Sequence, residues 1–456
     1  MTTFFVQFQV VPTEYNPQHA LLQGAFASCW VAEESQPAAY NKARFYIAKD
    51  EWEITETKSF PMEVTQTDFE DRDIGLDQYQ KSQESGIAIV YAGWARDGKT
   101  TAGPMPLERA RKFDLNAYVG KQKRLTQKGR CLHFESDNRC GAFINAHSIQ
   151  KNGQLSTIAD DGHVYTVSRN MGTLKRNDGH FALEKHGIGK VSTFLGFCGR
   201  HDNQLFSPID TWPLHPTGEQ VLLYAYRSIC RELFVKENTL ELIDSQLAAL
   251  PATSSALEFF EDLKTGTSFG LKNLRRHKEA FDDSLQAKRF ADIEYVLFTS
   301  KQRPLLAFSG LFFPEFDFLG RQIQNLANHR IRLDLLTICS APVVDGWGFL
   351  FSWHKTSSPA STEFMRSLAT VIHQKSSSGG DAMFRMVVSN CENLAVSPAW
   401  WDGLPAGQQA AVTARLSHGA NIFSPTNPEY LTRGLEGICQ WEFAAVHAAP
   451  ERMPRS

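Results

Sequence analysis

Cysteine and histidine side chains recur between residues 131 and 201 and constrain the fold more than any other pattern in this chain. Cys131 and Cys140 are separated by eight residues, and Cys198-x2-His201 follows after a long gap. Thiolate and imidazole are the ligands that Zn²⁺ prefers, and four of them in tetrahedral geometry form a closed structural site. We therefore predict a structural zinc site that ties two distant loops together. The alternative interpretation is a set of buried thiols beside a core histidine.

Composition excludes several other classes of protein. The chain is 42% hydrophobic and 21% charged with a formal net charge of -3, which is typical of a soluble globular protein and gives no bulk attraction to nucleic acid. We see no signal peptide and no apolar run of the roughly 18–20 residues that a membrane span needs. We therefore expect a cytoplasmic protein of bacterial source with no membrane partner. Five further cysteines are interpreted as buried thiols: Cys29, Cys230, Cys339, Cys391 and Cys439.

The two segments that flank the predicted zinc ligands also carry a second pattern. After Cys140 comes Ala142-Phe143-Ile144-Asn145-Ala146-His147-Ser148-Ile149, and Cys198 lies within Leu195-Gly196-Phe197-Cys198-Gly199-Arg200-His201-Asp202-Asn203. Over about residues 131–205 this order resembles the HNH, or ββα-metal, endonuclease family. In that family a general-base histidine ends the first strand. A helix that bears a metal ligand begins at the last pair of zinc ligands.

The resemblance implies roles for three residues. His147 matches the general base, which deprotonates a water for attack on a phosphodiester. Asp202 or Asn203 matches the ligand on the helix that holds Mg²⁺ or another divalent ion. Two positions depart from the family: Ala146 replaces an acidic or histidine ligand, and Ser192-Thr193 replaces an asparagine.

These departures leave alternatives open. The site is either inactive or recruits other ligands, for which the candidates are Asp160, Asp161, His163 and His180. His147 itself is equally well interpreted as a structural histidine at the end of a strand. The Asp160-Asp161-Gly162-His163 stretch contains a hairpin-type turn signal, and residues 164–167 are predicted to be the returning strand.

Length and patterning predict a multidomain α+β fold. A chain of 456 residues is expected to form two or three domains. We predict a small α+β domain over 1–98, a zinc-binding HNH-like domain over 107–215, a helical segment over 216–295 and a C-terminal α+β domain over 296–456. Residues 97–106 are the candidate linker. Strands are predicted over 4–10, 25–32, 52–57, 87–91, 304–313, 331–340, 347–353 and 384–388, and helices over 37–47, 218–250, 271–290 and 362–373.

Two functional hypotheses follow from the sequence. The first is a metal-dependent HNH-like nuclease with a structural zinc and a catalytic Mg²⁺ or other divalent ion. Family analogy alone suggests a role in bacterial defence against foreign DNA. The second is a non-catalytic zinc-stabilised module that binds nucleic acid or a protein partner. Basic residues that either contact phosphates or form a solvated face are Arg109, Arg111, Lys112, Lys121, Lys123, Arg124, Lys128, Arg130, Lys190 and Arg200.

Overall fold

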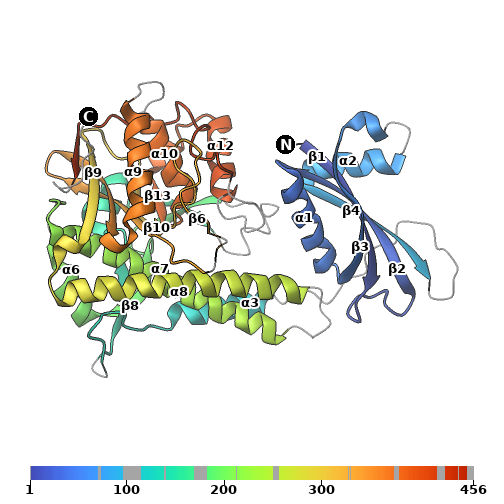
Figure 1. Cartoon of the computed structure of the whole chain (residues 1–456), viewed down its shortest axis with the longest axis horizontal. Helices are drawn as coiled ribbons and strands as arrows, with labels where there is room; N and C mark the ends of the chain where they lie inside the picture. The colour runs from blue at the N-terminus through green and yellow to red at the C-terminus, as the bar shows by residue number, and fades with distance from the viewer. Residues whose placement is uncertain are drawn as a thin grey trace. The chain divides into compact units, whose positions relative to one another are not determined.

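The computed structural model describes residues 2–69, 73–95, 115–137, 140–168, 182–211, 213–249, 256–326, 328, 330–373, 379–418, 427–439 and 441–448. The chain divides into two compact units (Figure 1). Unit 1 comprises residues 1–118, 240–266 and 421–425, and unit 2 comprises residues 119–239, 267–420 and 426–456. Some predicted features lie outside the described residues, namely the linker at 97–106, Arg109, Arg111, Lys112 and His180.

Unit 1 is built on a four-stranded antiparallel sheet with the strand order β3-β1-β2-β4. Every second residue of β1 from Phe4 to Val10 is buried, and this face packs against Ala43 and Ile47 of the first helix. The predicted alternation is confirmed. The elements are β1 (Thr2–Pro12), β2 (Leu22–Glu33), α1 (Gln36–Lys49), β3 (Trp52–Val64), a 3-10 turn (Gln66–Phe69), α2 (Asp73–Ser85) and β4 (Ile87–Ala95).

Unit 2 centres on an eight-stranded sheet with the order β14-β9-β12-β11-β10-β13-β6-β7. Its neighbouring strands pair in antiparallel fashion. Aromatic residues of β12 such as Phe349 and Phe351 share one core with Phe364 and Phe384 from the covering helices. The strands are β6 (His163–Ser168), β7 (Ala182–Gly187), β9 (Ile293–Ser300), β10 (Leu306–Phe312), β11 (Leu336–Val343), β12 (Gly346–His354), β13 (Leu394–Val396) and β14 (Ala445–Ala448).

Long helices accompany this sheet. α7 and α8 account for the helical segment predicted over 216–295, and α9 packs against β12 while α10 packs against β10. No helix within the described ranges is both long enough and apolar enough to cross a membrane. The longer helices are α3 (Leu115–Gln127), α7 (Gly218–Ala249), α8 (Ala256–Gln286), α9 (Ser358–His373), α10 (Gly379–Asn390) and α12 (Ala406–His418), and α11 (Pro398–Trp401) is a single turn.

The large sheet crosses two of the boundaries predicted from sequence. β6 and β7 belong to the predicted zinc-binding domain, yet β6 pairs with β13 of the predicted C-terminal domain through Thr166 and Ala395. The Asp161-Gly162 turn that opens β6 has both residues at positive φ, as the hairpin signal predicted. The mixed helix and strand content agrees with the predicted α+β class. The four predicted domains stay predictions about units that fold independently.

The strand predicted over 384–388 is wrong, because this segment lies inside α10. Every residue from Gly380 to Val388 is buried, so the helix has no polar face that could reveal its period. Even Arg385 is buried, and its guanidinium donates to the carbonyl oxygens of Leu431 and Gly434, each at 2.7 Å. A short apolar run in a helix that is buried all round cannot be distinguished from a buried strand by periodicity.

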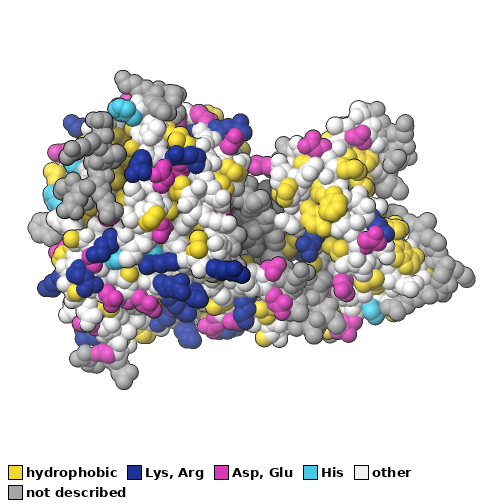
Figure 2. All heavy atoms as spheres, in the orientation of Figure 1, with side chains coloured by type: hydrophobic (Ala, Val, Ile, Leu, Met, Phe, Trp, Pro, Cys, Tyr) yellow, Lys and Arg dark blue, Asp and Glu magenta, His cyan; other side chains and the backbone are white. Residues whose placement is uncertain are grey.

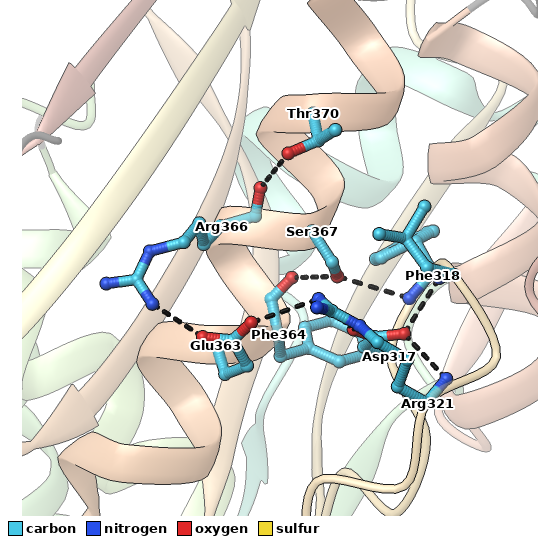
Figure 3. Close-up of polar contacts among 9 residues, drawn as sticks. Asp317, Phe318, Arg321, Glu363, Phe364, Arg366, Ser367 and Thr370 are labelled. Carbon is cyan, nitrogen blue, oxygen red and sulfur yellow. Dashed lines mark hydrogen bonds and ion pairs between the residues drawn. The ribbon is translucent and has the colours of Figure 1, made fainter. Parts of the chain in front are cut away.

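A buried carboxylate organises the loop that follows β10 (Figure 3). Asp317 is fully buried, accepts a hydrogen bond from the backbone N–H of Arg321 at 2.9 Å and pairs with the Arg321 guanidinium at 2.6 Å. The same guanidinium reaches Glu363 of α9 at 3.0 Å, and the N–H of Phe318 donates to Ser367 of α9 at 3.1 Å. The buried charge is therefore fully paired, and the loop is fixed to α9.

A buried histidine makes the stability of unit 2 depend on pH. His277 of α8 is inaccessible to solvent, and its Nε2 lies 2.7 Å from the carbonyl oxygen of Leu333. Burial lowers the pKa of His277 to about 4, against the opposing effect of that hydrogen bond. In the unfolded chain the His277 side chain binds a proton near pH 6.5, whereas in the folded chain it stays neutral until the pH is much lower. The contribution of His277 is therefore present above about pH 6.5 and lost as the pH falls toward about 4.

We expect this group alone to cost about 2 kcal/mol of stability at about pH 5 relative to neutral pH. The measurement is urea unfolding of the parent and His277→Gln at about pH 7.5 and about pH 5. The variant loses stability at both pH values, but its loss between them is expected to be smaller than that of the parent. Identical losses would show that His277 is not the group that titrates.

Candidate metal centre

A two-stranded sheet followed by a helix carries half of the predicted ligands. β5 (Phe143–His147) pairs in antiparallel fashion with β8 (Thr193–Cys198), and α6 (Gly199–Asp210) begins where β8 ends. Cys198 is the N-cap residue of α6, with φ −80° and ψ 154°. His201 lies three residues further on, within the first turn. The Cys198-x2-His201 spacing thus places a thiol and an imidazole at the start of one helix.

The four predicted ligands converge on one point. Ligand atoms of Cys131, Cys140, Cys198 and His201 all lie within 4.8 Å of one another. Nδ1 of His201 is 3.3 Å from Sγ of Cys131 and 3.5 Å from Sγ of Cys140, and the sulfurs of Cys131 and Cys198 are 3.9 Å apart. Tetrahedral zinc with ordinary bond lengths separates sulfur from nitrogen by about 3.6 Å and two sulfurs by about 3.8 Å. The donor set and its dimensions can therefore hold a metal ion such as zinc.

The other two ligands come from a segment whose described residues form neither helix nor strand. Backbone N–H groups of Arg130 and Leu132 donate to the carbonyl oxygens of Leu195 and Gly196, at 3.0 and 2.9 Å, so the segment runs beside β8. The N–H of Cys140 donates to the carbonyl oxygen of Asp137 at 3.0 Å.

The environment of the thiols favours metal binding over isolated thiolates. Burial raises the pKa of Cys131 to about 11, although backbone N–H groups of Cys198 and His133 donate to its sulfur. Burial acts the same way on Cys198, but hydrogen bonds from the backbone of His201 and from neighbouring thiols outweigh it and lower the pKa. N–H donors aimed at sulfur stabilise thiolate ligands, and a bound cation supplies the remaining charge.

His133 lies beside the cluster and is not one of its four ligands, although ligand atoms of His133, Glu135 and His201 also lie within 4.8 Å of one another. Its ring stacks on that of His201, with centroids 4.1 Å apart and planes 10° apart, so the lone pairs of the two rings run parallel rather than converging. Nδ1 of His133 accepts the N–H of Glu135 at 3.0 Å, which leaves the proton of the neutral ring on Nε2. Burial lowers the pKa of His133 to about 4 and keeps it neutral. Sequence reasoning missed this packing partner, whose only signal is its position two residues after Cys131.

His147 is the last residue of β5, as the resemblance predicted. The side chain is half-buried, and Nε2 lies 3.2 Å from the carbonyl oxygen of Ile188. Because a carbonyl can only accept, Nε2 carries the proton in the neutral ring and Nδ1 keeps its lone pair. Burial lowers the pKa of His147 despite this hydrogen bond. The ring is therefore neutral and oriented near pH 7, as a general base or a structural strand-end histidine would be.

Asp202 and Asn203 lie in different surroundings. Asp202 is 8% exposed and its Oδ1 has no hydrogen-bond partner, whereas Asn203 is exposed to solvent. Burial raises the pKa of Asp202, and the charge of Arg227 opposes that effect. Among the described contacts, no hydrogen bond or ion pair joins His147 to either residue. The structure thus brings the four predicted metal ligands together but does not link the three predicted catalytic residues directly.

The two positions that depart from the family are structural. Ala146 is 3% exposed and offers no ligand. The Ser192 hydroxyl lies 2.7 Å from that of Ser148 and accepts the N–H of Ile149 at 2.9 Å, so it is fully occupied. The alternative ligands Asp160, Asp161 and His163 lie at the turn that opens β6, and all three are exposed.

Comparison with known proteins identifies no relative. No protein-family model, no curated protein and no solved structure is significantly similar to this chain. The likeness to HNH endonucleases stays a prediction from the sequence.

Proposed function

We propose that this chain is a metal-dependent nuclease of HNH-like type in which a structural zinc ion is held by Cys131, Cys140, Cys198 and His201. The observation that carries the proposal is the hydrogen bond from Nε2 of His147 to the carbonyl oxygen of Ile188 at 3.2 Å. It fixes the ring at the end of β5, beside the strand that leads to the zinc ligands, with Nδ1 free to accept a proton.

In this proposal each residue has one task. Nδ1 of His147 accepts the proton of the water that attacks a phosphodiester. Asp202, with a free carboxylate oxygen, or the exposed Asn203 would hold Mg²⁺ or another divalent ion, which supplies positive charge to the developing phosphorane and leaving oxygen. The zinc ligands do no chemistry and fix β8, α6 and the segment around Cys131 relative to one another.

Nucleic acid is the partner that the surface charge supports. Lys272, Arg275 and Arg276 lie at helical spacing on α8 and are exposed. Figure 2 shows Lys and Arg side chains gathered on unit 2 where α8 lies in this view. Phosphate contacts of this kind position a nucleic acid without reading its sequence. Action within the bacterial cytoplasm, against foreign DNA, is the biological setting we propose.

The test is cleavage of plasmid DNA and of single-stranded RNA by the full chain, with and without Mg²⁺ or Mn²⁺. Cleavage that requires the divalent ion supports the proposal, and the absence of cleavage of both substrates contradicts it. The second candidate function is a non-catalytic zinc module for nucleic acid or a protein partner. Two observations favour it: Ala146 occupies a ligand position, and among the described residues no hydrogen bond or ion pair joins His147 to Asp202.

A further inference from the structure

An ion pair between the buried Arg227 and the exposed Asp210 holds helix α6 from one side. Arg227 of α7 is 3% exposed, and its Nη1 and Nη2 bind the two carboxylate oxygens of Asp210 at 2.7 and 2.9 Å. The same guanidinium lies over the ring of Phe206, with its carbon 4.0 Å from the ring centroid. Asp210 and Phe206 are one turn apart on α6, so a single side chain holds two turns of this helix.

The same carboxylate is tied to the segment that follows β5. Gln150 is buried and lies three residues after His147; its Nε2 lies 3.3 Å from Oδ1 of Asp210 and also donates to the carbonyl oxygen of Ile209. Gln154 fixes this segment in turn, since it accepts the N–H of Gln150 at 2.5 Å and donates to a carbonyl oxygen of β11 at 2.6 Å. Connected hydrogen bonds and an ion pair therefore join α6, α7 and β11 to the segment that follows β5.

Two buried atoms at this contact between α6 and α7 have no hydrogen-bond partner. They are Nε of Arg227 and Oδ1 of Asp202. Asp202, Phe206 and Asp210 recur at four-residue spacing on α6, so they share one face, and this face meets α7. Burial of unmatched polar atoms is costly, so the unpaired oxygen of Asp202 requires an explanation, which a bound ion would supply.

We infer that Arg227 is a positioning residue of the proposed nuclease site. Through Asp210 and Gln150 it sets the position of α6, with Asp202 on it, relative to the strand that ends at His147. This inference rests on the proposed function, because the separation of Asp202 and His147 matters only if both residues act in cleavage. It requires no contact between Arg227 and substrate. A displacement of about 1 Å in such a site lowers turnover by about 100-fold.

Arg227→Lys tests the inference, because lysine keeps the charge but cannot make the planar two-point contact with Asp210. The matched control is Arg385→Lys, which alters another buried arginine on α10. We expect Arg227→Lys to keep about one zinc per chain and to lower kcat by about 100-fold with KM little changed. Amide exchange is expected to rise both in residues 148–155 and in residues 203–210. Arg385→Lys is expected to leave cleavage and exchange in these two segments unchanged.

Three results would overturn the inference. Parent-like kcat for Arg227→Lys is one, loss of zinc from that variant is another, and unchanged exchange in both segments is the third. If the parent itself cleaves no nucleic acid, the proposed function fails, and the exchange measurement alone decides whether Arg227 holds the two segments in place. This role is supported when amide exchange rises in both segments of Arg227→Lys and in neither segment of Arg385→Lys.

Discussion

Cys198→Ala is expected to lower the zinc content of the purified protein from about one equivalent to below about 0.2. Cys198 is the link between β8 and α6, and its sulfur lies 3.9 Å from that of Cys131. Three remaining ligands hold zinc far more weakly than four, because a structural site gains its affinity from a complete and preformed tetrahedron.

Loss of the metal is expected to free the segment around Cys131 and Cys140. Its described residues form no helix or strand, and a bound metal would add to the contacts that this segment makes with α6, namely the stacking of His133 on His201 and the ion pair of Asp137 with Arg200 at 3.5 Å. Limited proteolysis should therefore cut Cys198→Ala between residues 128 and 142, where the zinc-loaded parent resists, and thermal unfolding should begin at a lower temperature.

Cys339→Ala is the matched control for this prediction. Cys339 is also a buried thiol, lies on β11 and is not part of the ligand cluster. Its loss is expected to cost about 1 kcal/mol of stability with no change in zinc content. Equal zinc content in Cys198→Ala, Cys339→Ala and the parent would contradict the assigned ligands.

His147→Ala is expected to lower divalent-ion-dependent cleavage of nucleic acid by about 1000-fold. The reason is the lost proton acceptor: Nδ1 of His147 keeps its lone pair because Nε2 binds the carbonyl oxygen of Ile188. KM is expected to change little, since the histidine acts on water rather than on substrate binding. Zinc content is expected to stay at about one equivalent, because His147 is not among the four ligands.

His19→Ala provides the control for the histidine prediction. His19 belongs to unit 1, and its Nδ1 likewise lies 3.0 Å from a backbone carbonyl oxygen, that of Pro12. This variant is expected to cleave at the parent rate. Equal cleavage by His147→Ala and the parent would remove His147 from the mechanism and favour the non-catalytic zinc module.

The ligand cluster could be predicted from sequence because its chemistry is specific. Few side chains suit zinc, and Cys198-x2-His201 brings two of them together on one helical turn wherever that helix forms. The strands of unit 1 and its first helix could likewise be predicted, since β1 alternates and α1 has an apolar face. In each case a local period carries the information.

The rest depends on contacts that have no local period. The pairing of Thr166 with Ala395 joins β6 to β13 across more than two hundred residues, so no composition change marks it. The ion pair of Arg227 and Asp210 joins α7 to α6, although nothing in the sequence distinguishes these two residues from ordinary surface charges. The helix around Phe384 was predicted as a strand because its burial hides the helical period.

X-ray absorption at the zinc edge of the purified full chain tests the central claim most directly. We predict about one zinc per chain, bound by three sulfurs at about 2.3 Å and one nitrogen at about 2.0–2.1 Å. The same spectrum from Cys198→Ala should lack the three-sulfur shell. Less than about half an equivalent of zinc in the parent, or a shell made only of nitrogen and oxygen, would contradict the proposed centre at Cys131, Cys140, Cys198 and His201.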